Sequence, residues 1–123
     1  LRFEAVLETA SELHVLTQLC AGGDLMRHLV KRKTFTELDA ARFTTHLLEA
    51  VAHCHRHGVM HRDVKPENLL VDLRKEATLV LADFGSAVVF KQGERFKHEA
   101  GSPFWSSPEA RSTIPRRPSR RTP

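Results

Sequence analysis

The sequence from His61 to Asn68 reads His-Arg-Asp-Val-Lys-Pro-Glu-Asn, and the triplet Asp83-Phe84-Gly85 begins fifteen residues after Asn68. These two segments supply two carboxylates, one amide and one ammonium group, all next to short apolar runs. Magnesium prefers oxygen ligands, an ammonium group can neutralise a phosphoryl group, and a carboxylate can accept the proton of a hydroxyl. The two segments therefore predict a site that handles phosphate and magnesium.

The spacing of the two segments resembles the catalytic core of eukaryotic protein kinases. Lys65, two residues after Asp63, is similar to the lysine of the Ser/Thr kinases. The strings Gly-Gly-Asp-Leu at 22–25 and Asp-Phe-Gly-Ser-Ala at 83–87 look most like the calmodulin-dependent branch, which includes plant and algal calcium-dependent kinases. The resemblance implies a protein serine/threonine kinase that uses ATP and Mg²⁺ and acts on a protein substrate. The sequence contains no calcium-binding loop of the Asp-x-Asp-x-Asp-Gly type, so it gives no support for direct calcium regulation.

The resemblance also implies an α+β, protein-kinase-like fold for residues 1–110. This part would comprise the end of the small-lobe sheet, the hinge and the first half of the mainly helical large lobe. Residues 111–123 are rich in Pro, Arg and Ser, a composition that predicts a basic disordered tail. The glycine-rich loop, the ATP-binding lysine and the glutamate partner of that lysine fall outside this sequence. We therefore expect an incomplete kinase domain that is inactive by itself.

Four residues receive catalytic roles from the resemblance. Asp63 is the base, Lys65 contacts the γ-phosphate, and Asn68 and Asp83 hold magnesium against the phosphates. Two apolar runs on either side of a polar turn, at 69–71 and 78–82, predict a short hairpin. We expect this hairpin to bring the two metal ligands to the same end.

The nucleotide site is expected beside a second hairpin, which two β-tolerant runs at 1–8 and 13–20 predict. By resemblance, the backbone of residues 18–20 is the hinge that binds adenine, and Leu70 is the floor of the pocket. Plainer roles stay open, for the Cys20 side chain as an ordinary sheet residue and for Leu70 as a core residue. The residues that the resemblance assigns to the nucleotide site are Gln18, Cys20, Asp24, Lys65, Glu67, Asn68, Leu70 and Asp83.

Asp24 follows the glycine pair Gly22-Gly23, which belongs to no Gly-x-Gly-x-x-Gly pattern, and it stands at a predicted helix start. An acid in the first turn of a helix is favoured by the helix dipole. By resemblance, Asp24 faces the ATP ribose and the incoming peptide, and both roles can hold together. The resemblance further places Asp24 and Glu67 near an arginine three residues before the phosphorylated Ser or Thr, so we expect basic substrates.

The segment Phe35–Gly58 has the clearest helical pattern. Thr36 with Asp39 three residues later resembles a capping box, and Gly58 stands where a left-handed terminus is expected. We expect the apolar stripe of this helix to face parts of a large lobe that lie outside this sequence. The stripe comprises Ala40, Phe43, Leu47, Val51 and Cys54.

Several histidines lie near the end of this helix. His53 and His57 have the four-residue spacing of a helical metal pair. No third ligand follows at a motif spacing, and histidines at a helix C-terminus have an electrostatic reason to be there. We therefore interpret them as helix-end residues, and His61 as a packed part of the catalytic loop.

Residues 86–109 correspond by resemblance to an activation segment, with Ser107 in place of the family's alanine before Pro-Glu. Arg62 marks kinases in which this segment is held by an acidic or phosphorylated residue. Residues 87–101 contain no Ser, Thr or Tyr. We therefore expect Arg62 to pair with Glu94 or Glu99.

Composition sets the remaining limits. A chain of 123 residues with 41% hydrophobic content can form one small domain, and two cysteines imply no disulfide framework. Five of the 19 basic side chains lie in residues 111–123, so residues 1–110 carry 14 basic against 15 acidic side chains, a net charge of −1. This distribution does not favour nucleic acid as a partner. The sequence has neither a leader nor an apolar run long enough for a membrane, so we expect cytosol or nucleus. A non-catalytic kinase-like binding fragment and an anion-binding arginine tail stay open as alternatives.

Overall fold

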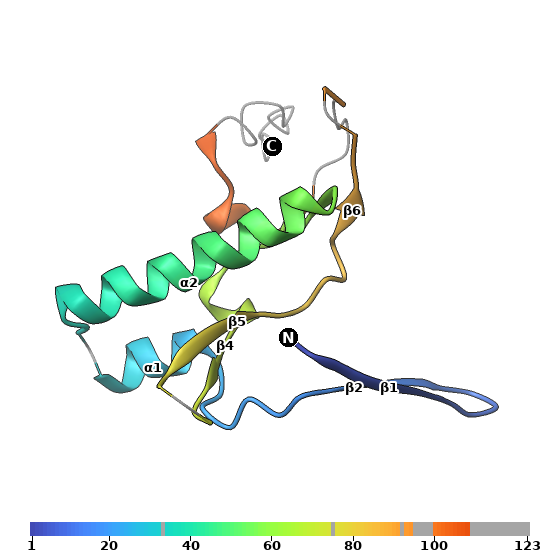
Figure 1. Ribbon diagram of the computed structural model, residues 1–123, viewed down its shortest axis with the longest axis horizontal. Coiled ribbons are helices and arrows are strands. Elements are labelled where there is room, and N and C mark those ends of the chain that lie inside the picture. Colours follow the sequence, from blue (N-terminus) through green and yellow to red (C-terminus); the bar gives the residue numbers. More distant parts are fainter. Residues whose placement is uncertain (33, 75, 92, 95–99, 109–123) are drawn as a thin grey trace, which may run out of the picture.

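The computed structural model describes residues 1–32, 34–74, 76–91, 93–94 and 100–108, and the predicted tail at 111–123 lies outside them. The described part is α+β, as predicted, with three two-stranded antiparallel sheets and two α-helices (Figure 1). None of its helices is long and apolar enough to cross a membrane. In chain order the elements are β1 (Phe3–Glu8), β2 (Leu13–Thr17), α1 (Leu25–Arg32), α2 (Glu37–Arg56), β3 (Val59–Met60), the 3₁₀ turn η1 (Pro66–Asn68), β4 (Leu69–Asp72), β5 (Thr78–Leu81), β6 (Val88–Val89) and the 3₁₀ turn η2 (Pro103–Trp105).

The predicted hairpin of the first twenty residues is present as β1 and β2. Its register places Glu8 opposite Leu13, and Thr9 Oγ1 closes the turn by accepting the backbone N–H of Glu12 at 3.0 Å. The second strand ends at Thr17, so the expected hinge residues lie beyond it in an extended connection. The hairpin projects away from the helices (Figure 1).

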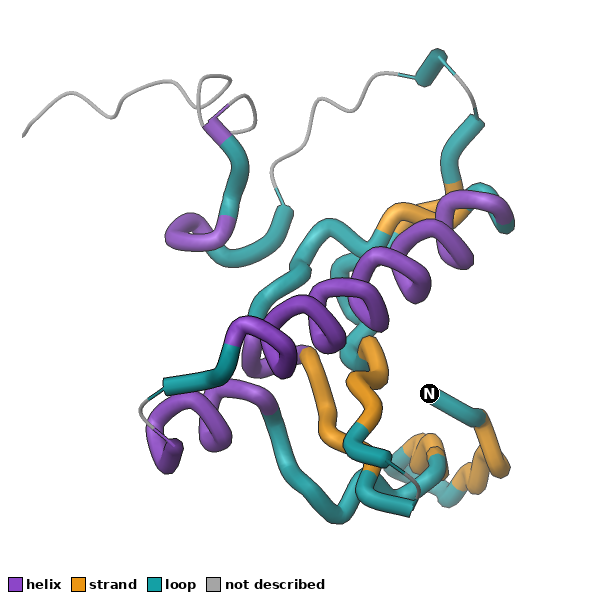
Figure 2. Tube along the Cα trace, turned by 60° about the vertical axis from the view of Figure 1, so that its left-hand side comes forward, coloured by secondary structure: helices purple, strands orange, loops and turns teal. Residues whose placement is uncertain are grey.

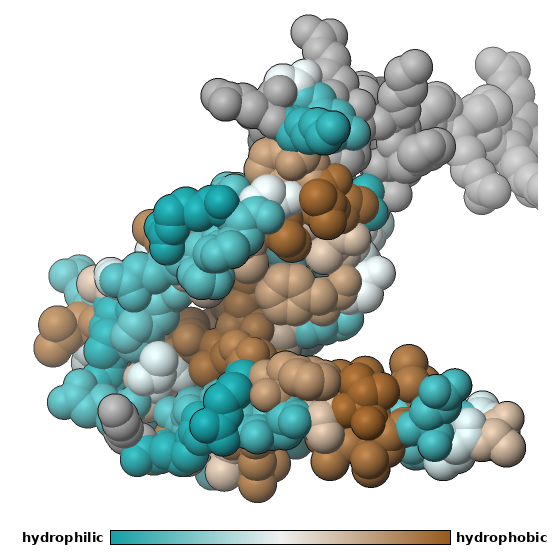
Figure 3. All heavy atoms as spheres, turned by 45° about the vertical axis from the view of Figure 1, so that its right-hand side comes forward, coloured by the Kyte–Doolittle hydropathy of each residue, from teal (hydrophilic) through white to brown (hydrophobic). Residues whose placement is uncertain are grey.

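Apolar side chains on both faces of this hairpin are exposed. Val6 and Val15, which lie opposite each other, are 48% and 59% exposed, and Leu7 and Leu13 are 54% and 64% exposed. The space-filling view shows hydrophobic residues along the projecting arm (Figure 3). Neither face of this two-stranded ribbon is buried against another described element, so the hairpin contributes little to the core.

Helix α2 begins and ends where its local signals predict. Thr36 Oγ1 accepts the backbone N–H of Asp39 at 3.1 Å, and Gly58, two residues after the helix, has a φ of 66°. Its apolar stripe packs against β4 and β5. The prediction that the stripe faces parts of a large lobe outside this sequence was therefore wrong, because the covering element is the β4–β5 hairpin. The packed part of the stripe begins at Phe43, and Ala40 is exposed.

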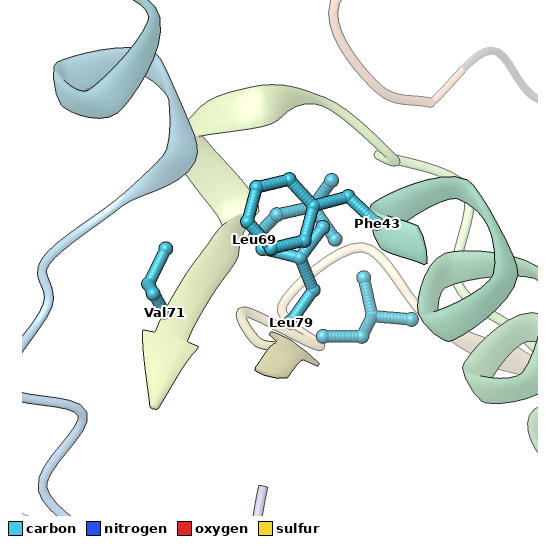
Figure 4. Packing of buried hydrophobic residues seen from close by; sticks show 5 residues of the cluster. Phe43, Leu69, Val71 and Leu79 are labelled. Carbon is cyan, nitrogen blue, oxygen red and sulfur yellow. The ribbon is translucent and has the colours of Figure 1, made fainter. Parts of the chain in front are cut away.

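The core lies between α2 and the β4–β5 hairpin (Figure 4). Leu69 pairs with Leu81 and Val71 with Leu79, and all four are buried together with Phe43. Burial of each such side chain contributes about 1.5 to 3 kcal/mol to stability. Because side chains alternate along a strand, the intervening Leu70 and Asp72 lie on the other face of β4.

The connection from β2 to α1 is held against β4 by its backbone. Gly22 N–H donates to the Val71 carbonyl at 3.0 Å, and Val71 N–H donates to the Gly23 carbonyl at 2.8 Å. A Cβ atom at Gly22 would overlap Val71, so this position requires glycine. The glycine pair therefore allows two chain segments to approach each other closely. This packing role agrees with the lack of a phosphate-loop pattern around the pair.

Candidate functional site

The predicted catalytic loop at residues 61–68 and the Asp83-Phe84-Gly85 segment are joined by His61, which is 3% exposed. Its Nε2 lies 2.9 Å from the Ala82 carbonyl, and the Asp63 N–H donates to its Nδ1 at 3.2 Å. A carbonyl can only accept, so the ring carries its proton on Nε2. The ring also packs edge-on against Phe84, with centroids 4.8 Å apart. This position confirms the interpretation of His61 as a packed part of the loop.

Asp63 is held at both carboxylate oxygens. Oδ1 accepts the backbone N–H of Ser102 at 2.8 Å, and Oδ2 accepts Lys65 Nζ at 2.7 Å and Asn68 Nδ2 at 3.2 Å. The hydrogen bond from the Lys65 ammonium is the main reason why the pKa of Asp63 lies below its usual value, although partial burial opposes this effect. The same bond raises the pKa of Lys65. Asp63 is therefore an oriented and ionised carboxylate with weakened basicity.

Ser102 completes this cluster, and its role was not predicted from the sequence. Lys65 Nζ donates to Ser102 Oγ at 2.8 Å, so the lysine bridges the aspartate and the serine. Gly101 lies directly against the backbone carbonyl of Arg62 and has a φ of 91°, which lets the chain approach the loop closely. The signal in the sequence was a glycine before a Ser-Pro pair at the end of the predicted activation segment.

Asn68 and Asp83 lie at adjacent ends of β4 and β5, as predicted. The Ala82 N–H donates to the Asn68 carbonyl at 2.9 Å, which joins the two positions through the backbone. Asn68 is 6% exposed, and its Nδ2 donates to the Asp63 carbonyl at 2.8 Å. Oδ1 is therefore the amide atom that can bind a cation. Asp83 is exposed, with a φ of 59°, and its Oδ1 accepts the Gly85 N–H at 3.2 Å.

This donor set fits magnesium better than zinc. Asn68 and Asp83 offer one amide oxygen and one carboxylate, and magnesium sites often use one or two protein carboxylates together with phosphate oxygens and waters. Within the described residues, no group of three or more His, Cys, Asp or Glu side chains could hold a metal ion. His53 and His57 instead stack with centroids 4.4 Å apart, and His57 Nδ1 bonds the His53 carbonyl at 2.8 Å.

The expectation that Arg62 pairs with Glu94 was wrong. Arg62 Nε donates to the Ser86 carbonyl at 2.7 Å, and its backbone has a φ of 66°. Glu94 closes its own turn, because its Oε2 accepts the Lys91 N–H at 3.0 Å. The other expected partner, Glu99, lies outside the described residues, as does Glu109 at the end of the predicted activation segment.

The residues expected around the nucleotide are only partly brought together. Asp24 and Leu70 are bridge partners, so the predicted ribose contact lies beside the predicted floor of the adenine pocket. Leu70 is half-buried on the face of β4 that points away from the core, which keeps it available to a ligand. Cys20 is half-buried in the connection after β2, and its neighbour Leu19 is 80% exposed.

Asp24 also has a structural role. Its Oδ1 accepts the Arg27 N–H at 2.8 Å and its Oδ2 lies 3.0 Å from Arg27 Nε, so it caps α1 from the position before Leu25. It therefore precedes the first turn in which it was expected. Glu67 is exposed on η1, which packs next to α1.

A cavity of about 560 Å³ is lined mainly by residues of β5 and of the C-terminal part of α2, together with Leu1, Val59 and Phe84. None of the residues assigned to the nucleotide lines it. The cavity adjoins the candidate site only through Phe84, and we assign it no part in the chemistry.

Comparisons with known proteins agree with this geometry. The family model described as protein kinase domain matches residues 1–117. Calcium-dependent protein kinase 32 of Arabidopsis thaliana is 48% identical over 103 residues, which cover 83% of this chain and 19% of that protein. Calcium-dependent protein kinase 8 of Oryza sativa subsp. japonica is 45% identical over 106 residues, which cover 85% of this chain and 20% of that protein. The chain thus spans about a fifth of the length of the curated relatives it matches.

Proposed function

The chain belongs to the protein kinase domain family, and we propose that the protein which carries it transfers the γ-phosphoryl group of ATP to a serine or threonine hydroxyl of a protein substrate. The observation that supports this proposal most is the set of bonds at Asp63. Lys65, Asn68 and the Ser102 N–H fix both carboxylate oxygens, so a substrate hydroxyl would meet an acceptor of fixed direction. Phosphoryl transfer depends mainly on such positioning and on stabilisation of charge.

In the proposed reaction, the substrate hydroxyl donates a hydrogen bond to Asp63 and its oxygen forms a bond to the γ-phosphorus. The bond between that phosphorus and the bridging oxygen breaks, ADP leaves, and the hydroxyl proton passes to Asp63. Because Lys65 lowers the pKa of Asp63, the carboxylate is a weak base. Its main role is therefore to orient the hydroxyl, with proton transfer late in the step.

Lys65 and the two metal ligands would stabilise the developing charge. The ammonium group of Lys65 lies 2.7 Å from Asp63 and 2.8 Å from Ser102 Oγ, so its position is fixed before substrate arrives. Asn68 Oδ1 and the Asp83 carboxylate would hold Mg²⁺. Magnesium, when bound, neutralises negative charge on the phosphate oxygens.

The experiment uses the full-length protein that contains this chain, with Mg²⁺, labelled ATP and a serine peptide. We expect Asp63→Asn to reduce transfer by about 10²- to 10⁴-fold, the range of general acid and base catalysis. Asp83→Asn is expected to reduce transfer and to raise the magnesium concentration needed. Glu49→Gln, on the exposed face of α2, is the charge-matched control.

Unchanged transfer in Asp63→Asn or Asp83→Asn would refute the assigned roles. If the full-length protein bound no nucleotide but held a protein partner, the non-catalytic alternative would be favoured. The 123-residue chain by itself is expected to show no transfer, because the loss of even one preorganised donor costs a reaction about 2.7 to 4 kcal/mol.

The proposed substrates carry an arginine three residues before the phosphorylated position. Asp24 and Glu67 support this proposal, and the bond from Arg27 to Asp24 adds a condition to it, because a substrate guanidinium must compete with Arg27. We expect Asp24→Ala or Glu67→Ala to weaken the preference for arginine over alanine about tenfold. Arg27→Ala should strengthen it. A full preference in the double variant of Asp24 and Glu67 would refute this assignment.

A further inference from the structure

The β1–β2 hairpin has few attachments to the rest of the molecule. The contacts of both strands are predominantly with each other, while α2, β4 and β5 pack together as a separate body (Figure 2). Residues 18–24 connect the two parts, and the backbone bonds of this connection to β4 begin only at Gly22. Some other contact must therefore determine how residues 18–20 lie relative to β4.

The side-chain amide of Gln18 is bonded to both parts. Its Oε1 accepts the Arg2 N–H at 3.0 Å, at the end of the hairpin. Its Nε2 donates to Asp72 Oδ2 at 3.2 Å, at the end of β4 and 54 residues away in sequence. The backbone N–H of Gln18 also donates to the Arg2 carbonyl at 2.9 Å. One amide group thus spans the junction between hairpin and body.

Arg74 holds the carboxylate of Asp72, the acceptor of this bond, in a fixed orientation. Its carboxylate, 14% exposed, accepts Arg74 Nη2 at 2.6 Å, Arg74 Nε at 3.0 Å and the Arg74 N–H at 3.0 Å. The Arg74 side chain lowers the pKa of Asp72 to about 2. Asp72 is therefore ionised at every physiological pH, and the bond from Gln18 is a charge-assisted one.

The position of Asp72 gives this bond a consequence for the nucleotide. Asp72 and Leu70 lie on the same face of β4, two residues apart, which is about 6.6 Å along a strand. A contact from Gln18 to Asp72 therefore fixes the position of the residue 18–20 backbone with respect to Leu70. These two elements would bind the edge and the face of adenine in the proposed function.

We propose that Gln18 is a positioning residue whose amide holds the hinge against Asp72 and so sets the shape of the adenine slot, with Arg74 fixing the acceptor. This inference rests on the proposed function for its effect on nucleotide. The hydrogen bond itself is independent of nucleotide. The hydrogen bond and its effect on nucleotide binding can therefore be measured separately.

The test reverses the polarity of the bond in the full-length protein. In Gln18→Glu, two carboxylates face each other. In Asp72→Asn, an amide oxygen at the Oδ2 position could still accept from Gln18 and from Arg74 Nη2, but the NH₂ group would then face the Arg74 N–H and Nε, which Oδ1 accepts in the wild type. The opposite orientation of the amide would lose the bond from Gln18. In the double variant, the carboxylate introduced at position 18 would accept from the new amide nitrogen at position 72, and the amide oxygen would face Arg74. Each single variant should therefore be defective, and the double variant should recover.

Two control variants match the charge changes of the single variants. Ser11→Glu adds a negative charge, as Gln18→Glu does, and Glu49→Gln removes one, as Asp72→Asn does. Both control positions are exposed and lie away from the bond. A defect caused by net charge alone would appear in these two proteins as well.

Two measurements are made on all six proteins. The affinity for ADP should fall about tenfold in each single variant, as expected for loss of a hydrogen bond to a charged group at a partly exposed site, and should return to within about threefold in the double variant. Hydrogen exchange of the Gly22 amide, measured without nucleotide, should speed up in both single variants and slow again in the double variant. A general loss of stability would not produce this recovery.

Single variants that match the wild type in both measurements, or a double variant that is no better than the worse single variant, would overturn the inference. If ADP binds all six proteins equally while exchange follows the expected pattern, the effect on the slot is refuted and the proposed function stands. If exchange follows the pattern but no protein binds ADP, the contact is supported and the proposed function fails.

Discussion

Replacement of Gly101 by alanine tests whether the contact between residues 101–102 and the catalytic loop orients Asp63. Gly101 has a φ of 91°, and a Cβ there would overlap the Arg62 carbonyl. Gly93 is a matched control, because its φ is 85° and a Cβ there would meet no atom of the described residues within 4 Å. Both substitutions carry the strain of a left-handed backbone, about 1 to 2 kcal/mol. Only Gly101→Ala must also displace the chain from the loop.

That displacement would separate the Ser102 N–H from Asp63 Oδ1, now 2.8 Å apart. A hydrogen bond to a charged group contributes about 1.5 to 3 kcal/mol. If this energy orients Asp63 in the transition state, kcat/KM should fall about 10- to 100-fold in Gly101→Ala. It should stay near the wild-type value in Gly93→Ala. The assay is phosphate transfer by the full-length protein, with a thermal melt of each variant. Equal kcat/KM for the two alanine variants would refute the reasoning.

Three further predictions concern stability, pH and association. Phe43→Ala, in the core between α2 and β5, should cost about 3 to 5 kcal/mol in the free energy of unfolding, whereas Leu48→Ala, 62% exposed on the same helix, should change it by less than about 0.5 kcal/mol in a denaturant titration. Because the folded pKa of Asp72 is about 2 and the usual value is near 3.9, its stabilising effect is present above about pH 4 and is lost as pH falls toward 2. An NMR titration should show this pKa rising toward 3.9 in Arg74→Ala, and an unchanged value would contradict the assigned cause. We expect the 123-residue chain to self-associate through the β1–β2 ribbon, whose outer edges pair with no other strand among the described residues. Val15→Lys, at a position that is 59% exposed, should reduce this association in sedimentation velocity, and equal association of both chains would argue against the hairpin as the contact.

The features that the sequence predicted well are those whose causes lie within a few residues. Thr36 caps the N–H of Asp39 three positions later, and Gly58 ends the helix through its own backbone conformation. The β4–β5 hairpin was readable because two apolar runs flank a polar turn. His61 was placed as a packed residue from the resemblance of residues 61–68 to a family, and its burial confirms that placement.

The features that the sequence did not predict depend on distant backbone groups. Ser102 reaches Asp63 across 39 residues, and nothing in the identity of a serine indicates that its backbone N–H will meet a carboxylate. Arg62 was expected to pair with Glu94 or Glu99, of which Glu99 lies outside the described residues. Instead of Glu94 it binds the Ser86 carbonyl, a group that every residue carries. The partner of the α2 stripe was missed for a related reason, since a stripe shows that burial occurs and does not show which element covers it.

The pairing of β4 with β5 has a consequence for inherited variation in the candidate magnesium site. Asn68 and Asp83 lie just outside the pair Leu69 and Leu81, so the relative position of these two ligands depends on the register of a four-residue ladder. Deletion of one residue within β5 would shift the strands against each other by about 3.4 Å, which exceeds the length of a magnesium–oxygen bond, about 2.1 Å. It would also turn buried leucines to the opposite face. A mutation that disrupts the candidate magnesium site can therefore lie in a strand whose residues supply no ligand.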